Sequence, residues 1–208
     1  MAKLCRLYLI TPPRIEITFP DTLARALDAG DVACLLLRQE DTSDDMVRAA
    51  IDTLRPVAQS RGVAFLLDNN PGLAVDTGCD GVHIGQGDIT CDQARAAFGP
   101  EGIVGVDCQG SRHLAIEAAE SGADYVSFGP FYGPPTNEDE ELADPDIVAL
   151  WDEATTVPSV AIGGITIENC PPLVRAGADF IAVSSAVWDA PQGAAAAVEG
   201  FNTAISQS

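Results

Sequence analysis

The sequence predicts one α/β domain, a (β/α)8 TIM barrel that spans residues 1–208. Short, β-rich apolar runs alternate with longer, alanine-rich amphipathic stretches along the whole chain, which is the pattern of repeated βα units. There are eight such runs, and most are apolar almost throughout, as expected for parallel strands covered on both faces. A doubly wound sheet is the alternative, but it normally has fewer strands, and no GxGxxG follows the first run.

The predicted strands are the eight apolar runs, in which aliphatic and aromatic residues predominate. They are Arg6–Ile10, Val32–Leu37, Val63–Leu67, Gly81–Ile84, Ile103–Val106, Tyr125–Phe128, Ser159–Ile162 and Phe180–Val183. The predicted helices are the amphipathic stretches that lie between or after the strands. They are Pro20–Ala29, Ser43–Arg61, Gly72–Thr77, Cys91–Phe98, Ser111–Ser121, Asp146–Ala154, Ile167–Ala176 and Gln192–Ile205.

A short repeat joins a helix to a strand at three places in the chain. The three copies are Gly78-Cys79-Asp80, Gly122-Ala123-Asp124 and Gly177-Ala178-Asp179. Glycine just after the last helical residue is a common helix stop, because glycine adopts the left-handed conformation without strain. The chain therefore repeats one unit, made of a helix, a glycine stop, an aspartate and a buried strand.

The charge balance excludes several classes of function. The chain has 31 acidic and 11 basic residues, which give a formal charge of −20. This field repels phosphate backbones and anionic lipid, so we expect neither nucleic-acid binding nor membrane-surface binding. Lys3 is the only lysine, which excludes Schiff-base chemistry, and His83 and His113 are too few for a multi-histidine metal site.

The cysteine pattern and the amino terminus predict a cytoplasmic protein. No apolar run approaches the roughly 18–20 residues of a membrane helix, and the first residues lack the apolar core of a signal peptide. The six cysteines form no CxxC, and we interpret them as buried free thiols in a reducing compartment. Trp151 and Trp188 predict either core packing or an interface between copies in a homo-oligomer.

The chemistry of such a barrel lies at the carboxyl ends of the strands and in the loops that follow them. The motifs there are Leu7-Tyr8-Leu9-Ile10-Thr11, Gly81-Val82-His83-Ile84-Gly85-Gln86 with Asp88, Gly129-Pro130-Phe131-Tyr132, Ala161-Ile162-Gly163-Gly164-Ile165 and Ala182-Val183-Ser184-Ser185-Ala186. With these motifs, spread in order over almost the whole chain, the sequence resembles the thiamine phosphate synthases and their thiazole-tautomerase relatives. The piece around His83 is the most specific.

The resemblance implies a transferase of thiamine biosynthesis that joins hydroxymethylpyrimidine diphosphate to a thiazole phosphate, both small phosphorylated heterocycles. The residues that it assigns to the phosphate and the substrates are Gly163, Gly164, Ser184, Ser185, His83, Gln86 and Asn137. Glycines allow a close approach of the backbone, and serines donate hydroxyl and N–H groups to a phosphate. The alternative is a plain Gly-Gly turn followed by serine helix caps, with His83 as a hydrogen-bonded core residue.

The resemblance also implies a Mg²⁺ site that is altered in this chain. The family has Asn-Asp after the third strand, with the aspartate as a ligand, whereas this chain has Asp68-Asn69. Asp88, the other family ligand, is present. We expect one cation held by oxygens of Asp68, Asn69 or Asp88 together with water. The alternative is that both aspartates are turn or capping residues.

The diphosphate end departs most from the family pattern. Arg38 is retained, but Gln39-Glu40 follows where the family has Glu-Lys, and Asp107 stands where a serine is expected. The family's Thr-Pro-Thr-Lys reads Pro134-Pro135-Thr136-Asn137 here, which leaves Thr136 without the lysine that should follow it. Arg38, Asp107 and Thr136 are the candidate catalytic residues. Each exchange of a cation for an anion or a neutral group weakens the attraction for a diphosphate.

Three functions are compatible with these residues. The leading one is a synthase with a modified diphosphate site. The second is a barrel that binds a thiamine precursor or performs another step such as tautomerisation, and the acidic run Glu138–Glu141 favours it unless that run is a solvated loop. His113 is expected on a helix face, off the tautomerase position. The third is an unrelated phosphate-binding barrel isomerase, which similarity across the whole chain disfavours.

Overall fold

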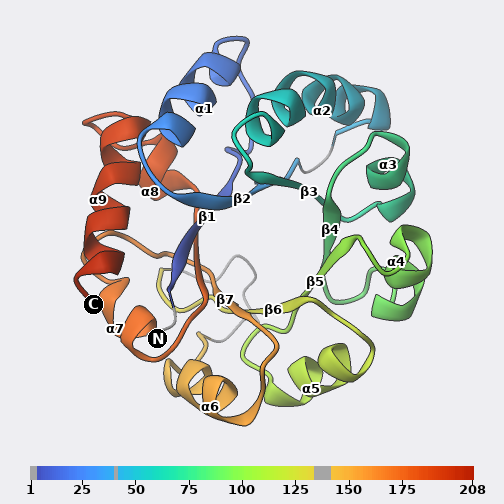
Figure 1. Cartoon of the computed structure of the whole chain (residues 1–208), viewed down its shortest axis with the longest axis vertical. Helices are drawn as coiled ribbons and strands as arrows, with labels where there is room; N and C mark the ends of the chain where they lie inside the picture. Colours follow the sequence, from blue (N-terminus) through green and yellow to red (C-terminus); the bar gives the residue numbers. More distant parts are fainter. Residues whose placement is uncertain (1–3, 40–41, 134–141) are drawn as a thin grey trace.

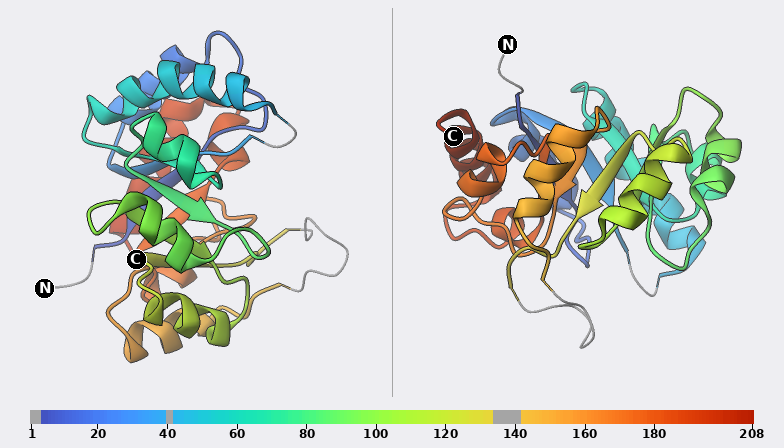
Figure 2. Two further views of the ribbon diagram at one scale, coloured as in Figure 1. Left: turned by 90° about the vertical axis from the view of Figure 1, so that its right-hand side faces the viewer. Right: turned by 90° about the horizontal axis from the view of Figure 1, so that it is seen from below.

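The structure is a computed structural model that describes residues 4–39, 42–133 and 142–208. Its eight parallel strands close into a barrel in sequence order, and β8 pairs with β1 (Figure 1). The helices surround the barrel as an outer layer, which is also clear in the side views (Figure 2). The predicted (β/α)8 TIM barrel is confirmed, and the doubly wound sheet is wrong.

The strands occupy the positions that the apolar runs predict, within one residue at either end. Strands β1 to β8 are Arg6–Ile10, Val32–Leu37, Ala64–Asp68, Gly81–Ile84, Ile103–Asp107, Tyr125–Phe128, Ser159–Ala161 and Phe180–Val183. Helices α1 to α9 are Phe19–Asp28, Asp44–Gln59, Pro71–Asp76, Cys91–Phe98, Arg112–Glu120, Asp146–Ala154, Pro171–Arg175, Ser185–Trp188 and Ala194–Ser206.

Two helices differ from the prediction for local reasons. Helix α7 begins at Pro171 rather than at Ile167, because the preceding residues form a turn in which the Thr166 N–H donates to Asn169 Oδ1 at 2.7 Å. Proline is tolerated in the first turn of a helix, where its missing N–H has no partner to lose. Helix α8, Ser185–Trp188, was not predicted, since four residues are too short to show a helical period.

Two apolar layers hold the barrel together. The side chains that point toward its axis form one buried cluster, which consists of Tyr8, Ile10, Cys34, Leu36, Leu66, Tyr125, Val160 and Ala182. The alternate strand residues, such as Leu7 and Leu9, face the helices and belong to a second, larger cluster. Successive strand residues point to opposite faces, so strands that are buried on both faces must be apolar at nearly every position.

The repeated glycine-aspartate sequence forms a structural clamp at the amino ends of the strands. The clamp pairs are Asp80 with Phe65, Asp124 with Val104 and Asp179 with Ser159. In the last pair, the Asp179 carboxylate accepts from the Ser159 N–H at 2.8 Å, and the Asp179 N–H donates to the Ser159 carbonyl at 3.1 Å. Each aspartate clamp therefore fixes the first residues of one strand against the start of the next.

The cysteines and the two tryptophans pack in or against the core. All six cysteines are free and buried, as expected. Burial raises the pKa of Cys108 to about 12, so this thiol is not a nucleophile at neutral pH. The Trp151 ring packs edge-on against Phe128, and the Trp188 ring packs edge-on against Phe19. Core packing is confirmed for Trp151, which is buried, whereas Trp188 is partly buried and packs against the core.

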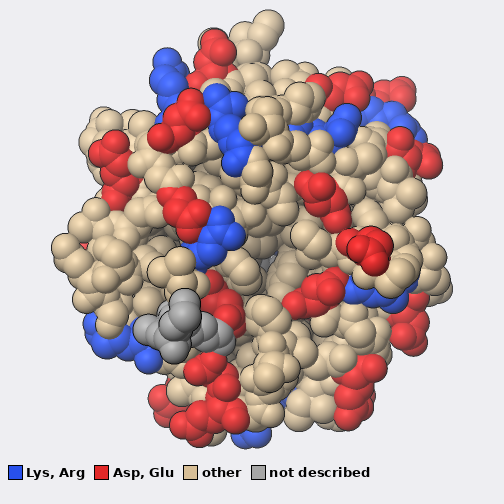
Figure 3. Space-filling model, in the orientation of Figure 1, with Lys and Arg blue, Asp and Glu red and all other residues tan. Residues whose placement is uncertain are grey.

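The surface is acidic, and several of its few basic groups are held in ion pairs. The exposed or half-buried pairs are Arg6–Asp31, Arg48–Asp76, Arg61–Asp28 and Arg95–Asp124. On the face shown in Figure 3, acidic groups outnumber basic ones, and several basic groups lie beside acidic ones. These pairs reduce further the positive charge that the surface offers to an anion. Among the described residues, no helix has the length and apolar character needed to span a bilayer.

Replacing Asp179 with alanine tests the clamp. We expect Asp179→Ala to lower the free energy of unfolding by about 1–3 kcal/mol, because the Ser159 N–H loses its acceptor. Chemical denaturation followed by circular dichroism measures the change. Glu153→Ala, an exposed position on α6, is the matched control. Equal stability of the two variants would contradict a structural role for the clamp.

Candidate active site

Two adjoining cavities open at the carboxyl ends of the strands. The larger is about 300 Å³ and its lining includes Thr11, Arg38, Gly163, Gly164, Ser184 and Ser185. The smaller is about 140 Å³ and is lined by Arg38, His83, Asp107, Gly129, Pro130, Ile162 and Gly163. Arg38, Ile162 and Gly163 line both cavities, so Arg38 stands at their boundary. The two glycines and two serines predicted to bind a phosphate, Gly163, Gly164, Ser184 and Ser185, lie together in the larger cavity.

The two glycines after β7 are required by close packing. Gly163 and Gly164 have φ angles of 96° and 62°, which favour glycine. A Cβ atom at Gly163 would collide with Pro130, and one at Gly164 would collide with the carbonyl of Tyr132. The predicted Gly-Gly turn is therefore real. It also brings this backbone to the wall of the larger cavity.

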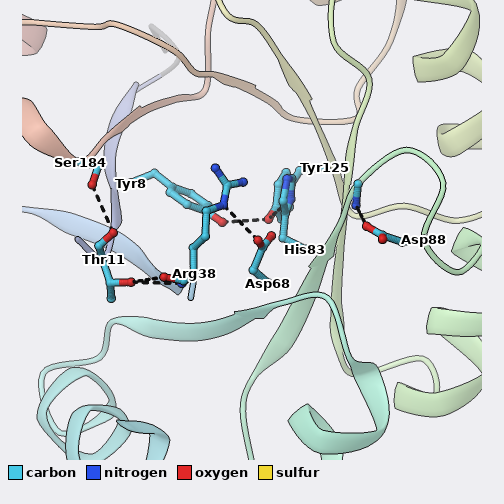
Figure 4. A network of polar contacts seen from close by, with 9 residues as sticks. Tyr8, Thr11, Arg38, Asp68, His83, Asp88, Tyr125 and Ser184 are labelled. Carbon is cyan, nitrogen blue, oxygen red and sulfur yellow. Dashed lines mark hydrogen bonds and ion pairs between the residues drawn. The ribbon is translucent and has the colours of Figure 1, made fainter. Parts of the chain in front are cut away.

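Ser184 does not cap its helix in the way that the alternative interpretation expects. It occupies the N-cap position of α8, but its side chain makes no capping hydrogen bond. Its Oγ instead donates to the Thr11 carbonyl at 3.2 Å, at the end of β1 (Figure 4). Ser185 is the first residue of α8 and is exposed in the larger cavity. Two adjacent hydroxyls are thus available at the cavity wall.

Arg38 is held by its side chain and by its backbone. Its Nε donates to Asp68 Oδ2 at 3.0 Å, and Figure 4 shows the two side chains turned toward each other. Burial lowers the pKa of the guanidinium, but Asp68 outweighs this effect and keeps the pKa above its usual value. The Arg38 N–H donates to Thr11 Oγ1 at 3.1 Å, and Thr11 Oγ1 lies 3.2 Å from the Arg38 carbonyl that accepts from it. The arginine is therefore charged and fixed in place.

His83 ends a chain of buried polar groups. Its Nδ1 lies 3.0 Å from the Tyr125 hydroxyl, which lies 3.0 Å from the Tyr8 hydroxyl. The imidazole stacks on the Tyr125 ring, with a centroid distance of 5.7 Å and an angle of 7° between the planes. Two effects lower the pKa of His83 to about 3: burial is the larger, and the positive charge of Arg38 is the smaller. The ring is therefore neutral at physiological pH.

The two tyrosines were not identified from the sequence. Tyr8 lies within one of the quoted motifs, but its apolar neighbours gave no sign that its hydroxyl reaches another strand. Tyr125 begins an apolar strand. Only closure of the barrel brings these two rings and His83 together, since they come from β1, β6 and β4.

Asp107 faces the smaller cavity from the end of β5. Its Oδ1 accepts from Ser127 Oγ at 2.9 Å, and its carbonyl accepts from the Gln86 side-chain amide. Gln86 is exposed and does not line either cavity, so its amide supports Asp107 from outside the cavity wall. Its role as a substrate contact stays a prediction.

The three predicted metal donors have different surroundings. Asp68 is paired with Arg38, and one oxygen of Asp88 accepts from the Gly85 N–H at 2.9 Å (Figure 4). Asn69 Oδ1 is buried without a hydrogen-bond partner, and the residue has a left-handed φ of 59°, which asparagine tolerates. Within residues 4–39, 42–133 and 142–208, no group of three or more His, Cys, Asp or Glu could hold a metal by itself.

Several sequence predictions fall elsewhere. Thr136, Asn137 and the acidic run Glu138–Glu141 lie outside the described residues. His113 lies on α5 with its Nε2 3.4 Å from Glu117, and it is exposed as predicted. Its side chain lies on the solvent-facing surface of the helix, which is not the environment expected of a catalytic base.

A closed parallel barrel with a glycine- and serine-lined cavity beside a half-buried arginine has the architecture of the (β/α)8 barrel enzymes, which carry their sites at the carboxyl ends of the strands. The family model described as thiamine monophosphate synthase matches residues 7–187. The chain therefore belongs to the thiamine monophosphate synthase family, whose members are transferases. The resemblance found in the sequence is confirmed, and the unrelated isomerase is wrong.

Individual relatives agree along nearly the full chain. The thiamine-phosphate synthase of Rhodospirillum centenum is 55% identical over 199 residues, which cover 95% of this chain and 96% of the relative. That of Hyphomonas neptunium is 47% identical, over 95% of this chain and 92% of its own. The solved structure of a thiamine phosphate pyrophosphorylase from Pyrococcus furiosus superposes with a TM-score of 0.86 at 28% identity, covering 97% and 96% of the two chains.

The neutral state of His83 predicts a pH dependence of stability. Between its folded pKa of about 3 and the ordinary value of 6.5, the unfolded chain binds a proton that the folded chain does not, so stability falls as the pH falls below 6.5. We expect the stability of the wild type relative to His83→Gln to fall by about 1.6 kcal/mol in total between pH 6.5 and 5, with the slope approaching about 1.4 kcal/mol per pH unit at the lower end.

Denaturant titrations at pH 8, 6.5, 5.8 and 5 measure this difference. Arg112→Gln, at an exposed position on α5, is the control and should keep the wild-type pH dependence, because arginine stays charged over this pH range. Parallel curves for the wild type and His83→Gln would contradict a buried neutral imidazole.

Proposed function

We propose that this chain is a thiamine phosphate synthase that couples hydroxymethylpyrimidine diphosphate to thiazole phosphate. The observation that carries the proposal is the pair of adjoining cavities with Arg38 at their boundary. A reaction that joins two small phosphorylated heterocycles needs two neighbouring binding spaces and a cation where the leaving group departs. The family membership of the chain supports the same reaction.

The larger cavity is the proposed site of the thiazole phosphate. Gly163 and Gly164 bring the backbone close, and the hydroxyls of Ser184 and Ser185 supply donors. Loops after the seventh and eighth strands are where barrels of this type commonly hold a phosphate. Neutral donors of this kind suit a protein whose net charge repels anions.

The smaller cavity is the proposed site of the pyrimidine ring. In the reaction, the bond between the methylene carbon and the diphosphate oxygen breaks, and its electron pair leaves on the oxygen. The lone pair of the thiazole nitrogen then forms the new carbon–nitrogen bond. Arg38 stabilises the negative charge that develops on the diphosphate, and Asp68 keeps the guanidinium oriented. Asp107 and the neutral imidazole of His83 form part of the wall of this cavity. By resemblance to the family, Thr136 is a proposed catalytic residue and Asn137 a proposed substrate contact.

We propose Asn69 and Asp88 as the protein donors to Mg²⁺. Asn69 Oδ1 is a buried oxygen without a partner, and Asp88 adds an exposed carboxylate, whereas Asp68 serves Arg38. Mg²⁺ commonly binds one or two protein oxygens and completes its shell with water and substrate phosphate, which suits this small donor set. When bound, the cation would neutralise charge on the departing diphosphate.

Removing Arg38 tests the proposed reaction. Purified protein is mixed with both substrates and Mg²⁺, and thiamine phosphate is followed by the fluorescence of its oxidised product. We expect turnover by the wild type and a loss of roughly 100- to 1000-fold in kcat/KM for Arg38→Gln, because a donor to the leaving group is lost.

Arg25→Gln, at an exposed position on α1, is the matched control and should keep wild-type turnover. The absence of turnover in the wild type, with thiazole phosphate still raising the melting temperature, would contradict synthase activity. That result would instead support a protein that binds the precursor without coupling it.

Replacing Asp107 tests the electrostatics of the smaller cavity. The negative charge of Asp107 raises the pKa of Arg38, and Asp107 stands where the family pattern has a serine. We expect Asp107→Ser to bind inorganic diphosphate about 3- to 10-fold more tightly in the presence of Mg²⁺, because a negative charge is removed. Isothermal titration calorimetry measures the affinity, and Asp92→Ser on α4 is the control. Weaker binding would show that this carboxylate helps to hold the diphosphate and its cation.

A further inference from the structure

Thr11 lines the larger cavity and contacts both Ser184, which lines that cavity, and Arg38, which lines both cavities. We propose that Thr11 is a positioning residue that couples occupancy of the phosphate cavity to the position of Arg38. This inference rests on the proposed function, since it requires both sites to bind ligands. Thr11 lines the larger cavity, yet only 2% of its surface is exposed, so its contacts are almost entirely with protein.

On one side, Thr11 holds the backbone of Arg38. Its Oγ1 accepts from the Arg38 N–H at 3.1 Å and donates to the Arg38 carbonyl at 3.2 Å. Its own N–H donates to the Leu36 carbonyl at 3.0 Å, which extends the pairing with β2 one residue beyond the end of β1. A single hydroxyl therefore satisfies both polar groups of the Arg38 backbone at the point where its side chain enters the cavities.

On the other side, Thr11 is held by the segment after β8. Its carbonyl accepts from Ser184 Oγ at 3.2 Å, and the preceding carbonyl, of Ile10, accepts from Trp188 Nε1 at 2.6 Å. Figure 4 shows Ser184, Thr11 and Arg38 as one continuous series of contacts. The end of β1 is therefore tied to α8 and to Arg38 at the same residue.

A phosphate in the larger cavity competes for one of these contacts. The Ser184 hydroxyl has one proton to donate, so donating it to a phosphate oxygen removes the bond to the Thr11 carbonyl. Thr11 has a stiff, β-branched side chain, and a shift of its backbone moves the hydroxyl that holds Arg38. Binding of one ligand then alters the affinity for the other, and the effect must be reciprocal.

The test measures this reciprocity by calorimetry. Thiazole phosphate is titrated with and without saturating inorganic diphosphate and Mg²⁺, and then the order of the two ligands is reversed. We expect each ligand to change the Kd of the other by about 5-fold or more in the wild type. Thr11→Val should bring this factor close to one, whereas Thr11→Ser, which keeps the hydroxyl, should retain it. Thr53→Val, an exposed threonine on α2, is the matched control.

A second pair of variants decides the question even if Thr11→Val fails to fold. Ser184→Ala removes the contact with Thr11 and should abolish the coupling, whereas Ser185→Ala should weaken thiazole phosphate binding and leave the coupling factor unchanged. Independent binding of the two ligands to the wild type would overturn the inference and leave the proposed function standing. Failure of thiazole phosphate to bind the wild type would overturn the proposed function, and this inference with it.

Discussion

Closure of the eight-stranded barrel is the constraint on which the rest of the molecule depends. A closed parallel sheet has no edge, and it brings every strand's carboxyl end to one rim. The aspartate clamps act at the opposite rim, where each carboxylate ties the start of one strand to the next, as Asp80 does with Phe65. Closure of the barrel brings Arg38, which follows β2, and His83 of β4 to the same cavity.

The sequence predicts what depends on neighbours in the chain. Apolar runs locate all eight strands, and the glycine-aspartate repeat marks where three of them, β4, β6 and β8, begin. It does not predict contacts across the barrel, because nothing local encodes them. Thr11 and Arg38 are 27 residues apart, and His83 and Tyr125 are 42 apart. The sequence shows a carboxylate, Asp68, at the end of the third strand. Its pairing with Arg38 depends on how the ends of two strands meet in the folded barrel.

The proposed substrate site carries little positive charge of its own. Within the described residues, both cavities share one arginine, and that arginine is subject to the charges of Asp68 and Asp107. Hydroxyls from Ser184 and Ser185 and close-packed glycine backbone supply the other donors at the larger cavity. Neutral donors, one oriented guanidinium and a divalent cation from solution are together a consistent way for a protein of charge −20 to hold phosphorylated substrates.

The separation of the clamp rim from the cavity rim has an evolutionary consequence. Substitutions at the carboxyl ends of the strands, such as aspartate for serine at Asp107, leave the aspartate clamps untouched. Mutations in the two regions are far enough apart for their effects on stability to add independently. A lineage can therefore accumulate changes in substrate preference without first acquiring compensating changes in the scaffold.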